Sequence, residues 1–383
     1  MKIVTIIGAR PQFIKAATVS RAIAAHNCMA ASSALPMTHN PSPITEVIIH
    51  TGQHYDEGMS AIFFRELEIP EPVHNLGIGS GPHGQQTGEM LAAIEQVLMA
   101  EQPNWVLVYG DTNSTLAGAL AAAKLHIPIV HIEAGLRSFN RHMPEEINRV
   151  VTDHLSTYLF CPSATAVQNL HREGIAPCPS SRTHDPLPMT PHVLIAGDVM
   201  ADALQFAAAK VSTNSDILNR LDLQPQSYLL ATVHRAENTD NNERLKNILL
   251  AFEAINEVIV FPVHPRTRNF LQSKGYQPPK NVRLIDPVGY FDIIALEKSA
   301  RILLTDSGGM QKEAYWLKVP CITLRDETEW VETVEAGWNV ITGADQNKIG
   351  NAVQNFTPSA EHPSLYGDGH AAEKIIKVLG VSS

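Results

Sequence analysis

Short apolar runs rich in β-branched residues recur along this chain, and most are separated by longer stretches with helical periodicity, such as 88–100 and 242–255. Buried strands that alternate with helices are typical of βαβ units and parallel sheets. The pattern therefore predicts an α/β protein. The predicted strands are residues 3–7, 46–50, 105–109, 127–132, 158–161, 192–196, 228–233, 258–263, 282–285, 302–303 and 321–324.

These strands form two sets, too many for one comfortable doubly wound sheet in 383 residues. We therefore predict two Rossmann-like domains that face each other across a cleft. The expected hinge is 176–191, which is rich in Pro, Ser and Thr and lacks periodicity. The first domain would span 1–185 and the second 186–364, and a helix within 365–383 would pack back on the first domain. Residues 27–45 are expected to form an irregular surface insertion.

Composition narrows the class of partner. The formal net charge of -10 argues against a nucleic-acid groove, because binding a phosphate backbone needs a basic face. The N-terminal apolar run is too short for a signal sequence or a membrane span. The four cysteines include no Cys-x-x-Cys pair, which favours a cytoplasmic protein without a disulfide framework.

A tight turn and a helix follow the first predicted strand. This places Arg10 and Lys15 beside a helix N-terminus at the carboxyl end of a strand. Open α/β sheets bind anions at such positions, because the backbone N–H groups and the helix dipole favour negative charge. We therefore expect both side chains to hold a small anionic ligand.

Carboxylates also gather at predicted strand ends in the first half. Asp111 follows strand 105–109, and Glu133 ends the next strand. Glu145 and Arg149 are spaced i,i+4, which would place them on one face of a helix. Carboxylates that reach one rim can serve as the acid and the base that proton transfer at carbon requires.

The second half repeats this arrangement. His234 and His264 each follow a predicted strand, which makes them better candidates for functional residues than an isolated histidine, and we expect His264 to bind the substrate. Ser307, Gly308 and Gly309 lie between a strand and a helix, where backbone N–H groups can cradle a diphosphate. Glu313, one turn later, could accept hydrogen bonds from ribose hydroxyl groups.

Residues 79–84 fit the dinucleotide-binding fingerprint, but no convincing strand precedes them and Pro82 interrupts them. We interpret them as a mobile loop near the cleft and predict no redox cofactor. The segment His131-x-Glu133 and the later histidines lack a recognised ligand spacing, so we also predict no catalytic metal.

Taken together, the sequence resembles the non-hydrolysing UDP-N-acetylglucosamine 2-epimerase family, over nearly its whole length. That family has the two-domain glycosyltransferase-B fold. The resemblance implies that Asp111, Glu133 and Glu145 are the catalytic carboxylates and that no cofactor is needed. It also implies a cytoplasmic homodimer that makes polysaccharide precursors such as those of O-antigen. The segments that carry it, in family order, are 8–15, 110–112, 130–137, 144–149, 234–238, 306–313 and 324–329.

The resemblance also implies which residues bind the UDP-sugar. Arg149 matches a cleft arginine, Tyr290 falls where the family has an aromatic contact to uracil, and His234 contacts UDP and is counted with the catalytic residues. The remaining residues that it assigns to UDP are Arg10, Lys15, Ser307, Gly308, Gly309 and Glu313.

Three residues depart from the common family pattern. With Ala9, Gln12 and Trp330 at these positions, the sequence resembles a subgroup of the family that epimerises UDP-2,3-diacetamido-2,3-dideoxyglucuronic acid. The substrate is therefore left open between that uronate and UDP-N-acetylglucosamine. Three further alternatives stay open: a retaining glycosyltransferase of the same fold, a hydrolysing epimerase, and a UDP-sugar binding protein without activity.

Overall fold

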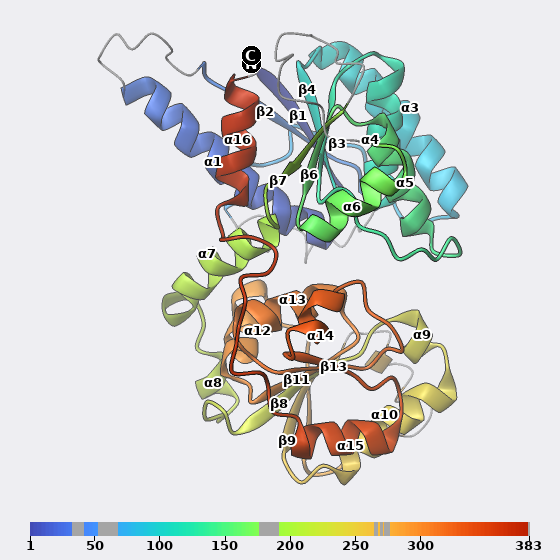
Figure 1. The fold of residues 1–383 in the computed structure, drawn as a ribbon, viewed down its shortest axis with the longest axis vertical. Helices are drawn as coiled ribbons and strands as arrows, with labels where there is room; N and C mark the ends of the chain where they lie inside the picture. The colour runs from blue at the N-terminus through green and yellow to red at the C-terminus, as the bar shows by residue number, and fades with distance from the viewer. Residues whose placement is uncertain are drawn as a thin grey trace. The chain divides into compact units, whose positions relative to one another are not determined.

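The computed structural model describes residues 1–32, 42–52, 68–175, 191–263, 267–268, 271 and 276–381. Contacts divide the chain into two compact domains (Figure 1). The first comprises Met1–Ala203 and Tyr366–Ser383, and the second comprises Leu204–Leu365. Each contains a parallel sheet with interleaved helices, so the predicted α/β class with two Rossmann-like domains is confirmed.

The sheet of the first domain has seven described strands in the order β3-β2-β1-β4-β5-β6-β7, all parallel. Its strands are β1 (Lys2–Ile7), β2 (Thr45–His50), β3 (His74–Asn75), β4 (Trp105–Tyr109), β5 (Ile129–Ile132), β6 (Tyr158–Cys161) and β7 (His192–Ile195). The central strands are buried on both faces, which is why they appear as continuous apolar runs in the sequence.

Helices cover both faces of this sheet. The apolar residues of α3 and α4 pack with those of β1, β2 and β4 in one core. The helices α1 and α16 lie side by side (Figure 1), and the carboxylate of Asp202 accepts the first N–H groups of α16. The helices are α1 (Arg10–Ser32), α3 (His83–Glu101), α4 (Asn113–Lys124), α5 (Pro144–Leu155), α6 (Ala164–Arg172), the first part of α7 (Val199–Asn214) and α16 (Ala371–Val381).

The second domain has six described strands in the order β10-β9-β8-β11-β12-β13, again all parallel. These are β8 (Tyr228–Thr232), β9 (Val258–Pro262), β10 (Val282–Ile285), β11 (Ile302–Thr305), β12 (Cys321–Thr323) and β13 (Asn339–Ile341). Its helices are α8 (Ile217–Arg220), α9 (Ala236–Thr239), α10 (Asn242–Ala254), α12 (Tyr290–Ser299), α13 (Gly308–Trp316), α14 (Val331–Glu335) and α15 (Gln346–Asn355).

The two-residue period of β8 divides its side chains between two cores. Leu229 and Ala231 pack with the helices α10 and α15, whereas Tyr228 and Leu230 pack with α8, α12 and α13 on the other face. The strand therefore needs apolar residues on both of its faces. Burial of each large side chain contributes roughly 1.5–3 kcal/mol.

Each sheet reverses its strand order at one point. In the first domain, β1 lies between β2 and β4, so the connections that leave β1 and β4 diverge to opposite sides; β8 and β11 mark the equivalent point in the second domain. Open α/β sheets bind ligands beyond the carboxyl ends of strands at such a switch point. The predicted site segments after β1, β4, β8 and β11 all follow strands that flank one of these two points.

The domain boundary expected at 185/186 is too early. Strand β7 pairs with β6 along its whole length, so residues up to Ala203 belong to the first domain. The sequence pattern identifies β7 as a strand but not its sheet, because pairing partners are set by tertiary contacts. Most of the expected hinge, 176–190, lies outside the described residues.

Two other local expectations need correction. The irregular insertion expected at 27–45 starts too early, because α1 continues to Ser32 through a segment rich in alanine; residues 33–41 lie outside the described part. Residues 79–84 are not all loop, because α3 begins at His83 and the side chain of Gln86 donates a 2.8 Å hydrogen bond to the Gly79 carbonyl. Among the described helices, none is both long and apolar enough to cross a bilayer.

Candidate active site

The turn after β1 is fixed against the end of β4 by Gln12. Its side-chain oxygen accepts the N–H groups of Gly8 and Ala9 at 2.8 and 3.1 Å, and its amide nitrogen donates to the Tyr109 carbonyl at 3.0 Å. Gln12 is 1% exposed. This residue uses both its donor and its acceptor, so the two loops at the switch point are held as one unit.

Lys15 and Glu133 form an ion pair beside this turn. Their side chains are only 9% and 10% exposed, so the pair is largely removed from water. Gly110, at φ +61°, lies against both charges: a methyl group there would be 3.0 Å from Glu133 Oε2 and 3.3 Å from Lys15 Nζ. Glu133 itself has φ 71°, a conformation that non-glycine residues seldom adopt and that is frequent at functional sites.

Arg149 connects two further carboxylates. It forms an ion pair with Asp111, and its Nη1 lies 3.3 Å from Glu146 Oε2. Burial acts against its charge, but Asp111 and Glu146 raise the pKa of Arg149 above its usual value. Its Nε has no hydrogen-bond acceptor among the described residues, and its Nη1 meets Glu146 as an ion pair without hydrogen-bond geometry. Buried unfilled donors of this kind are available to oxygen atoms of a substrate.

Glu145 lies in the first turn of α5 and is half-buried. It shares a helix with Arg149, but the ion pair on that helix is formed by Glu146 at i,i+3. Glu146 is committed elsewhere, because it also accepts the N–H groups of Ser138 and Phe139 at 2.9 Å. Within the described part of the chain, Glu145 makes no recorded side-chain hydrogen bond or ion pair, which leaves its carboxylate available.

A buried charge network supports this half of the site. The Nδ1 of His131 lies 2.7 Å from Asp153, and its Nε2 lies 2.7 Å from the carbonyl oxygen of Gly110. Burial alone would raise the pKa of Asp153, but His131 and Arg137 hold it below its usual value. The sequence pattern did not identify Asp153, because its partners lie sixteen or more residues away and its helix face appears ordinary.

In the second domain, α13 begins directly beyond β11. The hydroxyl oxygen of Ser307 caps this helix, and Gly308 follows beneath the indole of Trp330. A methyl group at Gly308 would lie 3.1 Å from Trp330 Nε1. The Nζ of Lys312 lies 3.8 Å from the centre of the Trp330 ring. Free N–H groups and a buried cation at a helix N-terminus favour a phosphate group.

Asp306 fixes the loop that carries His234. Its carboxylate is completely buried and accepts the N–H groups of His234 and Arg235 at 3.1 and 3.0 Å, and it also accepts from Asn238. The side chain of His234 itself is 48% exposed. The Asp306 carboxylate therefore joins the loops after β8 and β11 at the second switch point.

Glu313 is nearly buried and has a carboxyl neighbour that sequence reasoning missed. Glu297 on α12 is fully buried and lies beside the Glu313 carboxyl group. Among the described residues, no ordinary donor reaches either Glu297 oxygen. Burial and the adjacent Glu313 raise the pKa of Glu297 well above its usual value. Two adjacent buried carboxyl groups favour a proton held within the pair.

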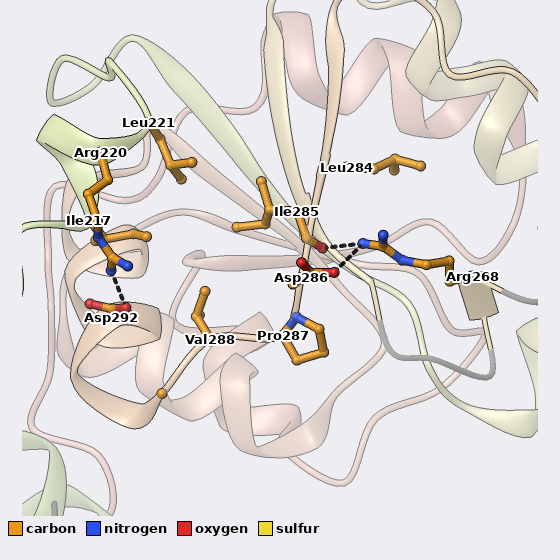
Figure 2. A pocket seen from close by; sticks show the side chains of 11 residues that line it. Ile217, Arg220, Leu221, Arg268, Leu284, Ile285, Asp286, Pro287, Val288 and Asp292 are labelled. Atoms are coloured by element: carbon orange, nitrogen blue, oxygen red, sulfur yellow. Dashed lines mark hydrogen bonds and ion pairs between the residues drawn. The ribbon is translucent and has the colours of Figure 1, made fainter. Parts of the chain in front are cut away.

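A pocket of about 510 Å³ lies at the end of β10, just before Tyr290, and Figure 2 shows the side chains that line it. Two ion pairs line it: Arg220 with Asp292 and Arg268 with Asp286. Tyr290 is 2% exposed and packs near Phe291, so its contact with a uracil base stays a prediction. The cavity is lined by Ile217, Arg220, Leu221, Arg268, Leu284, Ile285, Asp286, Pro287, Val288, Gly289 and Asp292.

The structure thus brings the predicted residues into two groups, one in each domain. Lys15, Asp111, Glu133 and Arg149 gather at the first switch point, with Glu145 on the same helix as Arg149. His234, Ser307, Gly308, Gly309 and Glu313 belong to the elements at the second. The Arg10 side chain and His264 lie outside the described residues.

Comparisons with known proteins give one consistent family. The model of the UDP-N-acetylglucosamine 2-epimerase family matches residues 37–380. A Methanococcus maripaludis UDP-N-acetylglucosamine 2-epimerase homolog is 52% identical, with 99% of each chain covered. The Pseudomonas aeruginosa UDP-2,3-diacetamido-2,3-dideoxy-D-glucuronate 2-epimerase is 46% identical, again over 99% of each chain. The crystal structure of Methanocaldococcus jannaschii UDP-GlcNAc 2-epimerase with UDP-GlcNAc and UDP matches with a TM-score of 0.85 and 42% identity over 100% of both chains.

Proposed function

Because this chain belongs to the UDP-N-acetylglucosamine 2-epimerase family, we propose that it is an isomerase that inverts C2 of a UDP-activated N-acetylhexosamine. The observation that carries this proposal is the arrangement of Asp111, Glu133 and Glu145. The first two lie just beyond β4 and β5, and the third lies in the first turn of α5. Removing a proton from one face of a carbon and returning one to the other face requires more than one acid or base.

The chemistry explains why the nucleotide must be held firmly. The C2 proton of an N-acetylhexosamine is not adjacent to a carbonyl group, so its removal alone would leave an unstabilised carbanion. If the C1–O bond to UDP breaks as a base takes the proton, the electron pair of the C2–H bond forms the C1=C2 bond of a neutral glycal and the C1–O pair leaves with UDP. UDP then adds back at C1 after C2 is protonated on the opposite face. Elimination and re-addition together leave the net oxidation state of the sugar unchanged.

Other residues of the two predicted groups would stabilise the leaving group. Negative charge develops on the diphosphate as the C1–O bond breaks, and preorganised donors stabilise such charge most effectively. We assign this role to the α13 N-terminus at Ser307, Gly308 and Gly309 and to Lys15. We assign Glu313 to the ribose hydroxyl groups, Arg149 to substrate oxygens, and His234 to the diphosphate region.

Two sugars fit this proposal. The 46% identical Pseudomonas aeruginosa relative is named for UDP-2,3-diacetamido-2,3-dideoxy-D-glucuronate, and the solved Methanocaldococcus jannaschii relative contains UDP-GlcNAc. Either product would serve as a precursor of cell-surface polysaccharide. The homodimer and the cytoplasmic location expected from the sequence remain part of the proposal.

The test is to incubate the purified chain with each sugar nucleotide separately and follow the anomeric and H2 signals by proton NMR. The proposal predicts an equilibrium mixture of two C2 epimers, still attached to UDP, for at least one of them. Stoichiometric release of UDP and a free sugar would support a hydrolysing epimerase. Sugar transfer only when an acceptor is added would support a glycosyltransferase.

A further inference from the structure

The ammonium group of Lys15 has two potential anionic partners. In the structure its ammonium group is paired with Glu133, and this pair is about nine-tenths buried. Under the proposed function, on which this inference rests, Lys15 also binds the diphosphate and Glu133 acts as an acid or base at C2. One ammonium group cannot serve both partners fully, because the carboxylate and the diphosphate are both negative.

The other described charges of this half-site offer no substitute. Arg149 is held between Asp111 and Glu146, so its charge is already matched by two carboxylates. Lys15 and Arg149 therefore face Glu133, Asp111 and Glu146, and the described side chains of this cluster carry a net negative charge. A diphosphate entering here adds further negative charge. If one of these cations changes partner, this half-site repels its ligand less.

Lys15 is the cation built for such an exchange. It is a compact point charge on a flexible four-carbon stem, whereas a guanidinium between two carboxylates is fixed by its planar fork. Gly110 has no side chain, which leaves the space beside Nζ and Oε2 open: a Cβ there would lie 3.3 and 3.0 Å from them. Lys15 also lies in the second turn of α1, beside the helix N-terminus where an anion is favoured.

We infer that Lys15 exchanges partners when the nucleotide binds: its ammonium group leaves Glu133 for the diphosphate, and Glu133 is thereby freed for proton transfer at C2. No covalent bond changes in this exchange. Its consequence is an order of events. Glu133 stays paired with Lys15 until the leaving group is in place. The base therefore becomes available only when the diphosphate is bound and can accept the electron pair of the C1–O bond.

The inference predicts that Glu133 competes with UDP for Lys15. We would measure UDP binding by calorimetry to wild type, Glu133→Gln, Lys15→Gln and the double variant. Glu133→Gln should bind UDP at least about fivefold more tightly than wild type, since a coupling of this size is typical between linked sites. Lys15→Gln should bind more weakly. In the Lys15→Gln background, Glu133→Gln should change the affinity little, because the competition has been removed.

Glu145→Gln is the matched control, because it removes a carboxylate of the same domain, in the first turn of α5, for which the described residues show no ion pair. A general electrostatic effect would tighten UDP binding in both backgrounds and for both glutamates. Thermal unfolding checks each variant, and Lys15→Met replaces Lys15→Gln if the latter fails to fold.

The inference is overturned if Glu133→Gln leaves the UDP affinity of the wild-type background unchanged, or if its tightening persists without Lys15. Either result can occur while the chain still epimerises a sugar, and then only the inference fails. If the coupling is present but neither sugar is epimerised, the proposed function fails instead. A wild-type chain that does not bind UDP would overturn both.

Discussion

The Nε2 atom of His131 lies 2.7 Å from the carbonyl oxygen of Gly110, and this contact ties β5 to the turn that carries Asp111. The other ring nitrogen of His131 is bound to Asp153. A completely buried histidine therefore joins two strand ends and a helix. Because Glu133 follows two residues later, the same contact positions two of the proposed catalytic carboxylates.

Replacing His131 should be costly for this reason. We expect His131→Leu to destabilise the first domain by about 3 kcal/mol, because Asp153 keeps a buried charge with one partner removed. His171→Leu, on an exposed position of α6, should stay within about 0.5 kcal/mol of wild type. Urea unfolding monitored by circular dichroism measures both. Equal effects of the two substitutions would contradict this account of the network.

Glu297 should make stability depend on pH. Its raised pKa means that the folded chain retains a proton which the unfolded chain releases above about its ordinary value of 4.5. Stability is therefore lost as pH rises from that value toward the folded pKa. Glu297→Gln keeps the shape and a donor to Glu313 but removes the ionisation. The melting temperature of this variant should exceed that of wild type by more at pH 8 than at pH 5. A pH-independent difference would show that Glu297 is not protonated in the folded chain.

Gly308 and Gly309 should respond to alanine in opposite directions. A methyl group at Gly308 would lie 3.1 Å from Trp330 Nε1. Trp330 cannot easily move away, because it is 6% exposed and its backbone oxygen accepts a hydrogen bond from the Thr333 hydroxyl. At Gly309 the nearest atom lies 3.9 Å away. We expect Gly308→Ala to lower thermal stability and Gly309→Ala to raise it by up to about 1 kcal/mol, the usual helical gain over glycine. Differential scanning fluorimetry of the two variants compares the signs directly.

Replacing the buried Asp306 should lower stability more than replacing the exposed Asp326. Asp306→Asn replaces one acceptor oxygen with an NH₂ group that faces the N–H groups of His234 and Arg235. We expect a loss of about 2 kcal/mol in stability and weaker UDP binding. The matched substitution Asp326→Asn breaks only an exposed ion pair with Arg244 in the same domain and should cost less than about 1 kcal/mol. Calorimetric UDP titrations with both variants would show whether the buried carboxylate organises the site.

Much of this site could be predicted because its parts follow strands. An apolar run marks a strand, and in a parallel sheet the residue after it must lie at the carboxyl edge, so Asp111, Glu133 and Ser307 were placed by local pattern alone. Their supporting partners could not be predicted in this way. Asp153 and Glu297 are buried acidic residues on helices, and only the tertiary fold shows that each faces an ionisable group distant in sequence. The sheet membership of β7 was missed for the same reason.

The central claim is that carboxylates of the first domain move a proton at C2, and the most direct measurement is solvent exchange at that carbon. The wild-type chain and Glu133→Gln would be incubated in deuterium oxide with UDP-N-acetylglucosamine and, separately, with the diacetamido uronate. We predict that wild type incorporates deuterium at C2 of at least one sugar as its epimer appears, and that Glu133→Gln slows this by at least about a hundredfold while still binding UDP. If wild type incorporates no deuterium at C2 of either sugar, the proposed reaction is wrong.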